Sequence, residues 1–392
     1  MKSALLSILL YAGITGTLFA WNLPLDVDLV DVTSSSSYTV LVSYGEIPDQ
    51  LSERHFAYLT SQGSPTVQAS FTTTESGISC LTVGTEYYCG NDSWDLNNNR
   101  FGMSEEGSAD DVSFSTNYSL PSSIYQNTVG WYWYVYAVND TTLASPVHIG
   151  TSVHDYFTLL NAPKPPFYNN QVWREVLWKS CSWASGETSE SSVLTDITNT
   201  LYSSGFQYNT ETLPVYYSEP YFLLEDFIVD YGEDEKNVNC VDMACAVDIF
   251  ASALGCYVSC DQMTWSRVKF PVNVIDLIGD TTEVTNNPLL STPIDNNCRT
   301  GGFILHVYAI NNSNYVWDAT LKYDTDANPN NVIPDGGCGT TTGGTVLVLP
   351  TNVSRTTFST NLTDEEKASY DSQSFSTYPL SYSSFGYQLY VE

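Results

Sequence analysis

The stretch Asn237–Gly255, NVNCVDMACAVDIFASALG, decides how the rest of the chain is interpreted. Its apolar residues recur at intervals of three and four, which predicts an α-helix with one buried face. These residues are Met243, Ala244, Val247, Ala251 and Leu254. Asn239 is a favoured N-cap residue, and Gly255 is a favoured stop. Cys240 is therefore expected at the first helical position, where backbone N–H groups and the helix dipole stabilise a thiolate.

The chain contains nine cysteines, an odd number for a protein in which cysteines pair. Cys80 and Cys89 flank a short segment and are expected to form a local bridge. Six further cysteines could form three more bridges: Cys181, Cys245, Cys256, Cys260, Cys298 and Cys338. This leaves Cys240 reduced, although its helix position and not the odd count selects it. A Cys240–Cys245 bridge is excluded because five helical steps separate the Cα atoms by about 8 Å.

The cysteine spacing does not predict a metal site. Three residues separate Cys256 from Cys260, and Cys298 follows alone, so the paired spacing of a zinc knuckle is missing. The sequence also has no Cys-x-x-Cys pair, which argues against a redox protein. We therefore expect neither a metal nor an organic cofactor.

The first twenty residues have the pattern of a secretory signal peptide. Lys2 gives a basic start, Leu5–Leu10 an apolar run, and Ala20 a small residue before a cleavage point. The apolar run is too short to span a bilayer, and no later segment reaches the required length. We expect residues 1–20 to be removed and the protein to be secreted and extracellular, without a membrane span.

The chain is strongly acidic, with 44 Asp and Glu against 13 Lys and Arg, a formal charge of −31. Removing the signal peptide deletes Lys2, so 44 acidic residues face 12 basic ones and the charge becomes −32. Nucleic acid and anionic membrane surfaces would be repelled, so neither is an expected partner. Sequons begin at Asn91, Asn117, Asn139, Asn311, Asn352 and Asn361, and they predict a glycoprotein in a glycosylating host.

Residues 21–161 show strand patterns and no convincing helix. The segment 38–42 alternates, and the run Val129–Val138 is rich in aromatic and β-branched residues. Polar clusters separate such runs, which predicts an all-β domain in the form of an antiparallel β-sandwich. The second run is similar to a late strand of fibronectin-type or immunoglobulin-like modules. A stiff Pro-rich stretch at 162–167 is expected to be the linker after this domain.

Residues 168–392 change from helical to strand patterns. Apolar residues at helical spacing occur in 172–177, 193–201 and 223–229, ahead of the stretch that carries Cys240. Strands are expected at Gly302–Ile310, Tyr315–Lys322, Thr345–Leu349 and Phe385–Val391. Helices followed by strands predict an α+β domain.

His306 and Asp318 are expected on the two strands of one hairpin. A turn signal at 311–314 separates the strands. If the hairpin turns symmetrically about Asn312, the two residues stand directly across from each other on one face, with Cβ atoms about 5 Å apart. That arrangement requires a loop with an odd number of residues.

Cys240, His306 and Asp318 together supply a nucleophile, a base and a group that orients the base. The histidine takes the thiol proton, and the resulting imidazolium lowers the pKa of the thiol further. The aspartate holds the ring in one orientation and balances its charge. Of the four histidines, His306 is the one that follows the cysteine helix in the sequence.

These residues resemble the transglutaminase-like superfamily. Asn239–Asp242 followed by Leu254-Gly255 is similar to the nucleophile helix of that family, with its Cys-x-Asp start and Leu-Gly end. His306 in GGFILHVYAI matches the family histidine, and Trp317–Thr320 is similar to its Trp/Asp-Pro-Thr strand. The resemblance covers residues 168–350 and implies a papain-like α+β fold with the catalytic triad Cys240, His306 and Asp318.

The departures from the family pattern concern the substrate more than the triad. Asn239 stands where a glycine-acid or glycine-glutamine pair is common, and Tyr308 stands where tryptophan is usual. The sequence between the strand of His306 and the strand of Asp318 is also short. No residue matches a side-chain oxyanion donor, so the resemblance implies only the backbone N–H of Cys240 for that role.

Together these features predict a secreted thiol enzyme that attacks amide carbonyls through an acyl-enzyme. Water would resolve that intermediate in a peptidase, amidase or deamidase, and an amine would resolve it in a transglutaminase. Hydrolysis is preferred because no feature of an amine site is found. The expected substrate is a protein or peptide, with extracellular matrix and cell wall as candidates. The alternative is a non-catalytic extracellular binding protein, in which the β-sandwich carries recognition and the second domain is inactive.

Overall fold

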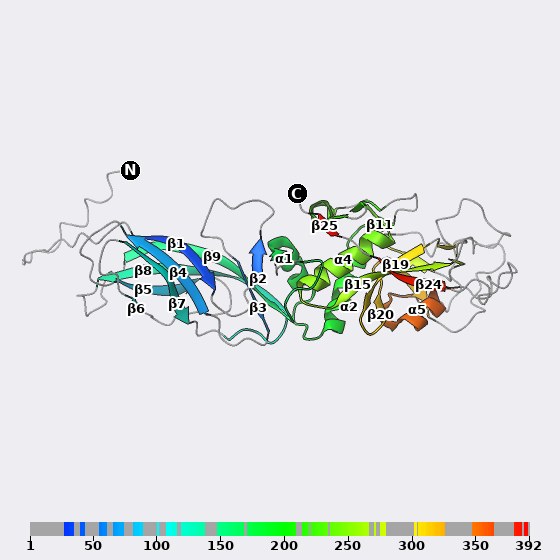
Figure 1. Ribbon diagram of the computed structural model, residues 1–392, viewed down its shortest axis with the longest axis horizontal. Helices are drawn as coiled ribbons and strands as arrows, with labels where there is room; N and C mark the ends of the chain where they lie inside the picture. Colours follow the sequence, from blue (N-terminus) through cyan, green and yellow to red (C-terminus); the bar gives the residue numbers. More distant parts are fainter. Residues whose placement is uncertain are drawn as a thin grey trace, which may run out of the picture.

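The computed structural model in Figure 1 describes a large part of the chain. By residue number it describes 27–34, 40–43, 55–60, 66–73, 81–88, 100–101, 107–115, 119–137, 147–167, 171–208, 214–218, 221–233, 236–265, 270–271, 275–279, 302–303, 305–325, 347–363, 380–385 and 388–390. Both helices and strands are present, which confirms the α+β class. Among the described helices, none combines the length and the apolar character needed to cross a membrane.

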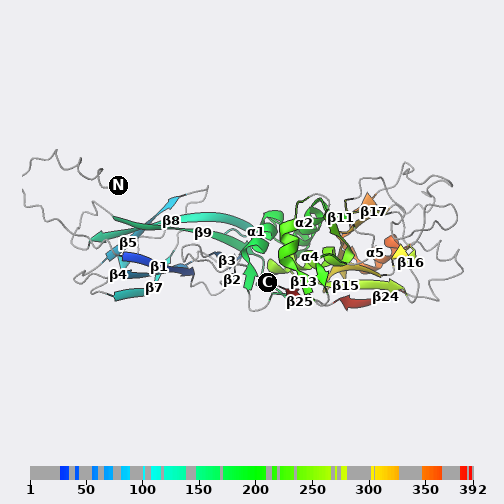
Figure 2. The same ribbon diagram turned by 90° about the horizontal axis from the view of Figure 1, so that it is seen from above.

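The regular elements described in the N-terminal half are strands. Their bounds are β1 (Val27–Ser34), β2 (Val40–Ser43), β3 (Phe56–Leu59), β4 (Thr66–Thr73), β5 (Leu81–Tyr88), β6 (Arg100–Phe101), β7 (Gly107–Ser115), β8 (Tyr125–Ala137) and β9 (Val147–Leu159). β1, β4 and β7 form one antiparallel sheet. The other strands form a seven-stranded sheet in the order β10-β2-β3-β9-β8-β5-β6, with β10 at Gln171–Trp173. Figure 2 shows its long strands β8 and β9 side by side.

This seven-stranded sheet is mixed, and the prediction of a purely antiparallel arrangement was wrong. β3 runs parallel to β9, with Phe56 opposite Tyr156. β10 runs parallel to β2, with Val172 opposite Val42. Parallel neighbours are joined by long connections, so the alternation within each short strand carries no information about them.

The C-terminal half contains all the helices of the described chain. They are α1 (Arg174–Trp183), α2 (Glu190–Tyr202), α3 (Leu224–Asp230), α4 (Cys240–Ala253) and α5 (Arg355–Leu362). Short strands connect them: β11 (Gln207–Tyr208), β12 (Tyr217–Ser218), β13 (Tyr221–Leu223) and β14 (Asn237–Val238). The later strands are β15 (Val258–Trp265), β16 (Phe270–Pro271), β17 (Ile275–Leu277), β18 (Gly302–Phe303), β19 (Leu305–Asn311), β20 (Tyr315–Trp317), β21 (Leu321–Asp324), β22 (Leu347–Val348), β23 (Thr351–Ser354), β24 (Leu380–Phe385) and β25 (Gln388–Tyr390).

A five-stranded sheet in the order β23-β20-β19-β15-β24 supports this half, and α4 packs on its strands β15 and β19. The predicted helices at 193–201 and 223–229 are confirmed as α2 and α3. The predicted helix at 172–177 begins only at Arg174, because Val172 and Trp173 belong to β10. The predicted strand Tyr315–Lys322 is divided into β20 and β21.

Helix α4 is buried on every side, not on one face as its apolar spacing predicted. All of its residues from Cys240 to Ala253 are buried. The helix packs against α1, α2, β15 and β19, so even its small and polar positions lie against protein. Asn239 caps the helix as predicted: its Oδ1 accepts the N–H groups of Val241 and Asp242 at 2.9 and 3.2 Å.

One apolar core runs from the N-terminal sheet into the helices. It contains Phe157 of β9, Val176 of α1, Leu194 of α2, Val247 of α4 and Ala309 of β19. Burial of apolar surface contributes about 25 cal/mol per Å². Burial of apolar surface in this one core therefore stabilises both halves. A second cluster, which includes Tyr308 and Phe358, lies between the five-stranded sheet and α5.

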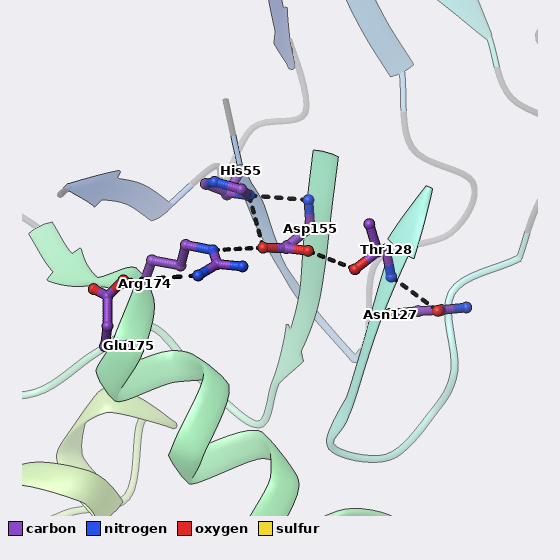
Figure 3. Close-up of polar contacts among 6 residues, drawn as sticks. All are labelled: His55, Asn127, Thr128, Asp155, Arg174 and Glu175. Atoms are coloured by element: carbon purple, nitrogen blue, oxygen red, sulfur yellow. Dashed lines mark hydrogen bonds and ion pairs between the residues drawn. The ribbon is translucent and has the colours of Figure 1, made fainter. Parts of the chain in front are cut away.

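A buried carboxylate also joins the halves (Figure 3). Asp155 of β9 accepts hydrogen bonds from Thr128 Oγ1 of β8 and from Arg174 Nε of α1, both at 2.6 Å. The Nδ1 of His55 accepts the backbone N–H of Asp155 at 2.9 Å. Burial raises the pKa of Asp155, but His55, Thr128 and Arg174 lower it more, to about 2. The carboxylate is therefore ionised at neutral pH and binds the first residue of α1 to the N-terminal sheet.

The Pro-rich connection is packed on the C-terminal end of α4. The N–H of Lys164 donates to the carbonyl of Ser252 at 2.9 Å, and the N–H of Asn161 donates to that of Leu254 at 3.4 Å. Gly255 has a φ of +86°, and a Cβ added there would lie 2.2 Å from the carbonyl oxygen of Asn161. The predicted stop of the helix is thus also the point where the connection crosses it.

Replacing Gly255 with alanine should lower the free energy of unfolding by about 3–4 kcal/mol, because both the left-handed backbone and the clash with Asn161 oppose it. Gly232 is the matched control. Its φ is +85°, but a Cβ there meets nothing within 4 Å. Gly232→Ala should cost only about 1–2 kcal/mol. Denaturant midpoints of the two variants measure the difference. Equal midpoints would contradict the close approach of Asn161 to Gly255.

The described cysteines do not show the predicted three-bridge pattern. Cys181, Cys245, Cys256 and Cys260 are buried free thiols in the structure, as is Cys240. Several other expectations concern residues outside the described ranges: the signal peptide at 1–20, Cys80, Cys89, Cys298, Cys338, and the sequons at Asn91, Asn117 and Asn139.

Candidate functional site

Cys240 is the first residue of α4, as the capping pattern predicted, and its side chain is 5% exposed. The cap is reciprocal, because the N–H of Asn239 donates to Asp242 Oδ2 at 3.0 Å. The same carboxylate accepts the N–H groups of Val215, Tyr216 and Tyr217 at 2.9–3.0 Å. Asp242 therefore fixes both the helix start and the segment that passes in front of it.

Burial raises the pKa of Asp242 to about 6, against the four backbone N–H groups that lower it. At neutral pH the carboxylate is ionised, which is the form that accepts all four N–H groups best. Its negative charge at the first turn is also favourable to the helix dipole. Asp242, which the family resemblance marked only as the acid of the Cys-x-Asp start, is thus the centre of the local structure around Cys240.

His306 and Asp318 are in direct contact, with Nε2 and Oδ2 2.6 Å apart. The route to this contact differs from the predicted one. Ala309 pairs with Trp317 and Ile310 with Val316, so the hairpin turns about Ser313 and not Asn312. Extending this register puts His306 opposite Thr320. The loop still has an odd number of residues, so His306 and Asp318 keep a common face and meet diagonally.

The surroundings of Asp318 aim it at the histidine. β20 ends at Trp317, and the N–H of Asp318 donates to the carbonyl of Pro350 at 2.9 Å. Its Oδ1 accepts the N–H of Thr320 at 2.8 Å, which leaves Oδ2 for His306. Both side chains are buried, at 0% exposure for His306 and 1% for Asp318. The His306 ring also stacks on Phe358, with ring centroids 6.1 Å apart.

Cys240 lies close enough to His306 for its thiol to be among the groups that raise the pKa of the imidazole. Burial lowers the pKa of His306, but the charge and hydrogen bond of Asp318 and the contact with Cys240 outweigh it and raise the pKa to about 10. The imidazolium is therefore favoured at neutral pH. Since Asp318 occupies Nε2, the ring nitrogen left for the thiol is Nδ1.

Tyr208 is a residue of this site that the sequence did not indicate. Its half-buried ring packs against both apolar clusters, and its hydroxyl lies near the thiol of Cys240. Burial, followed by the neighbouring Cys240, raises the pKa of Tyr208 well above its usual value. The hydroxyl therefore keeps its proton and can donate it in a hydrogen bond at neutral pH.

A two-residue ladder explains the position of Tyr208. Tyr208 of β11 pairs in parallel with Val238 of β14, two residues before Cys240. The N–H of Tyr208 donates to the carbonyl of Ile278 at 3.0 Å. Strands this short have no alternation to detect, and the partners are thirty residues apart. No sequence signal therefore distinguishes Tyr208 from its neighbour Phe206, which is a core residue.

The structure thus places Cys240 and Tyr208 near the hydrogen-bonded pair of His306 and Asp318. Such a set can ionise a thiol, hold an imidazolium and donate a hydrogen bond beside the sulfur. Within the described part of the chain, no group of three or more His, Cys, Asp and Glu side chains could hold a metal ion.

Comparisons with known proteins find similar solved structures. No protein-family model matches the sequence, and no curated protein matches it. A solved structure that is similar is the transglutaminase of red sea bream, with 10% sequence identity and a TM-score of 0.35. The match covers 69% of this chain and 49% of that chain, so this chain spans about half the length of that enzyme.

Proposed function

We propose that this chain is a thiol enzyme in which Cys240 attacks amide carbonyls. The observation that supports the proposal is the position of Cys240, at the start of α4, near a histidine that is bound to Asp318. A buried histidine bound to a buried carboxylate can be purely structural. A thiol on its other side, at a helix N-terminus, favours catalysis instead.

In the proposed reaction, Cys240 reacts as the thiolate of a thiolate–imidazolium pair. Its sulfur bonds to the carbonyl carbon, and the carbonyl oxygen becomes an oxyanion. The Cys240 backbone N–H and the Tyr208 hydroxyl donate hydrogen bonds to that oxygen. His306 gives its proton to the leaving nitrogen, the C–N bond breaks, and a thioester remains on Cys240. Asp318 keeps the ring oriented throughout and balances its charge.

Hydrolysis of the thioester by water is the proposed outcome, with transfer to an amine as the second arm of the test. We further propose that the substrate is a protein or peptide met outside the cell. The N-terminal half is proposed to be a β-sandwich domain that presents such a substrate. Its division between two sheets, with three strands in one and six in the other, which β10 extends, supports this.

The decisive experiment combines labelling and turnover. Brief treatment with iodoacetamide at neutral pH, followed by peptide mapping, should find the adduct on Cys240 before any other cysteine. Dimethylcasein should release ammonia or peptides when incubated with the protein, and a fluorescent alkylamine in the mixture reports transfer. If Cys240 reacts no faster than Cys181 and no product forms, the chain is a non-catalytic binding protein.

Replacing Tyr208 with phenylalanine should lower kcat about 10²–10³-fold, the usual effect of removing one oxyanion donor. KM should change little, because the hydroxyl acts on the transition state and not on the bound substrate. Tyr202→Phe is the control, since Tyr202 donates to Asp276 and not to the candidate site. A Tyr208→Phe variant with unchanged kcat would remove Tyr208 from the mechanism.

A further inference from the structure

Two cysteines outside the candidate site lie sulfur to sulfur. Cys245 of α4 and Cys260 of β15 have Sγ atoms 3.9 Å apart, and both side chains are buried. Among the cysteines that the structure describes, they are the pair whose sulfurs are in contact. A disulfide requires a separation of about 2 Å. Closing the remaining gap of about 2 Å requires a change of side-chain rotamer or a small shift of α4 against β15.

We propose that Cys245 and Cys260 are a cross-linking site, where oxidation during folding joins α4 to β15. The predicted signal peptide leads to a compartment in which disulfides form. One thiolate attacks a small-molecule disulfide such as oxidised glutathione, forms a mixed disulfide and releases one thiol. The second thiolate attacks the protein-bound sulfur and releases the other thiol. The protein pair loses two electrons and two protons, and the small disulfide is reduced to two thiols.

The surroundings of the pair explain why the reaction belongs to folding. Asp248 places Oδ2 3.9 Å from Cys260 Sγ, while its Oδ1 accepts a hydrogen bond from Ser252 at 2.9 Å. Burial, and with it the nearby Asp248 carboxylate, raises the pKa of both thiols. In the folded chain the pair is therefore protonated and unreactive. A chain that folds reduced stays reduced, and a chain that folds with a disulfide present keeps the bond.

The bond would fix the geometry of the candidate site without touching it. Cys245 follows Cys240 by five residues on the same helix. Cys260 is paired with Ala309 of β19, the strand that carries His306. A link between α4 and β15 therefore limits how far Cys240 can move from His306. It also closes a loop across fifteen residues, which restricts the unfolded chain.

The test compares full-length protein refolded in a glutathione redox buffer with protein refolded in excess dithiothreitol. After blocking with N-ethylmaleimide and digestion without reduction, mass mapping of the oxidised sample should find Cys245 joined to Cys260. Its Tm should exceed that of the reduced sample by about 5 °C. Cys260→Ala should abolish this redox-dependent difference, and Cys181→Ala should keep it.

Two results would overturn the proposal. One is the recovery of Cys245 and Cys260 as blocked free thiols from the oxidised sample. The other is a bridge from either cysteine to a different partner. The mapping uses the unaltered chain, so it tests the proposal even if one of the variants fails to fold. A Cys240→Ala chain should form the same bridge, which separates this proposal from the catalytic one.

Discussion

Replacing Cys240 with alanine should lower kcat by about 10⁶-fold, the loss seen when a covalent nucleophile is removed from a preorganised site. Of the described residues near Cys240, neither Tyr208 nor His306 can replace it, since Tyr208 keeps its proton and His306 is held by Asp318. Binding of substrate should survive, because the thiol contributes to the bond being formed and not to recognition. Turnover of dimethylcasein and a binding isotherm for the same protein measure the two effects separately.

Cys181→Ala is the matched control for this prediction. Cys181 is also a helical, fully buried free thiol, but it lies on α1. The same substitution there should leave kcat unchanged and alter only stability, by about 1 kcal/mol. Turnover by Cys240→Ala within tenfold of the unaltered chain would show that the chemistry takes place elsewhere.

The position of Cys240 could be predicted from the sequence because it depends on local interactions. Asn239, Asp242 and Gly255 lie within one helix length of each other, and each acts on the nearest backbone groups. Such signals need no knowledge of the rest of the fold. The depth of burial of α4 could not be predicted in the same way. It depends on elements from both halves of the chain, whose placement the helix sequence does not encode.

The contact between His306 and Asp318 was predicted for a reason that is only partly correct. Whether the hairpin turns about Asn312 or about Ser313, its loop has an odd number of residues. His306 and Asp318 therefore share a face in either register. The centre itself moved to Ser313 because Asn314 has a φ of 60° and closes a three-residue loop. Asn311 supports this loop by accepting the N–H groups of Ser313 and Tyr315 at 3.0 Å. The prediction of a turn about Asn312 assumed a symmetric loop and did not include these hydrogen bonds.

The contacts missed by the sequence analysis are those between distant short segments. Tyr208 reaches Cys240 through a ladder of two residues, and β10 joins β2 across more than a hundred positions. The hydrogen-bond partners of Asp155 likewise come from distant parts of the chain: β8, α1 and His55. Neither periodicity nor capping reports such pairings, since each depends on where the chain returns after folding.

Asp318→Asn should lower kcat about 10⁴-fold while leaving the structure intact, because the amide has the size of the carboxylate but not its charge. His306 would lose the partner that raises its pKa to about 10, and its burial would then favour the neutral ring. The proposed reaction would then depend on hydroxide or another base to remove the thiol proton, so the rate should rise with pH over a range in which the rate of the unaltered chain is constant. Asp276→Asn, which removes a carboxylate bound by Tyr202, is the control.

The same substitution should change how stability depends on pH. The native pKa of His306, about 10, exceeds the ordinary value of 6.5, so the folded chain binds more protons between these limits. Its contribution to the free energy of unfolding is complete below pH 6.5 and is lost as the pH rises through 10. Asp318→Asn should remove that decline, as denaturant titrations at pH 6, 8 and 10 would measure. Asp242 has a pKa of about 6, so its titration changes stability below pH 6.5 and does not affect the decline between pH 6.5 and 10. A decline that persists in Asp318→Asn would mean that another group titrates, and that Asp318 does not hold the imidazolium on which the proposed chemistry depends.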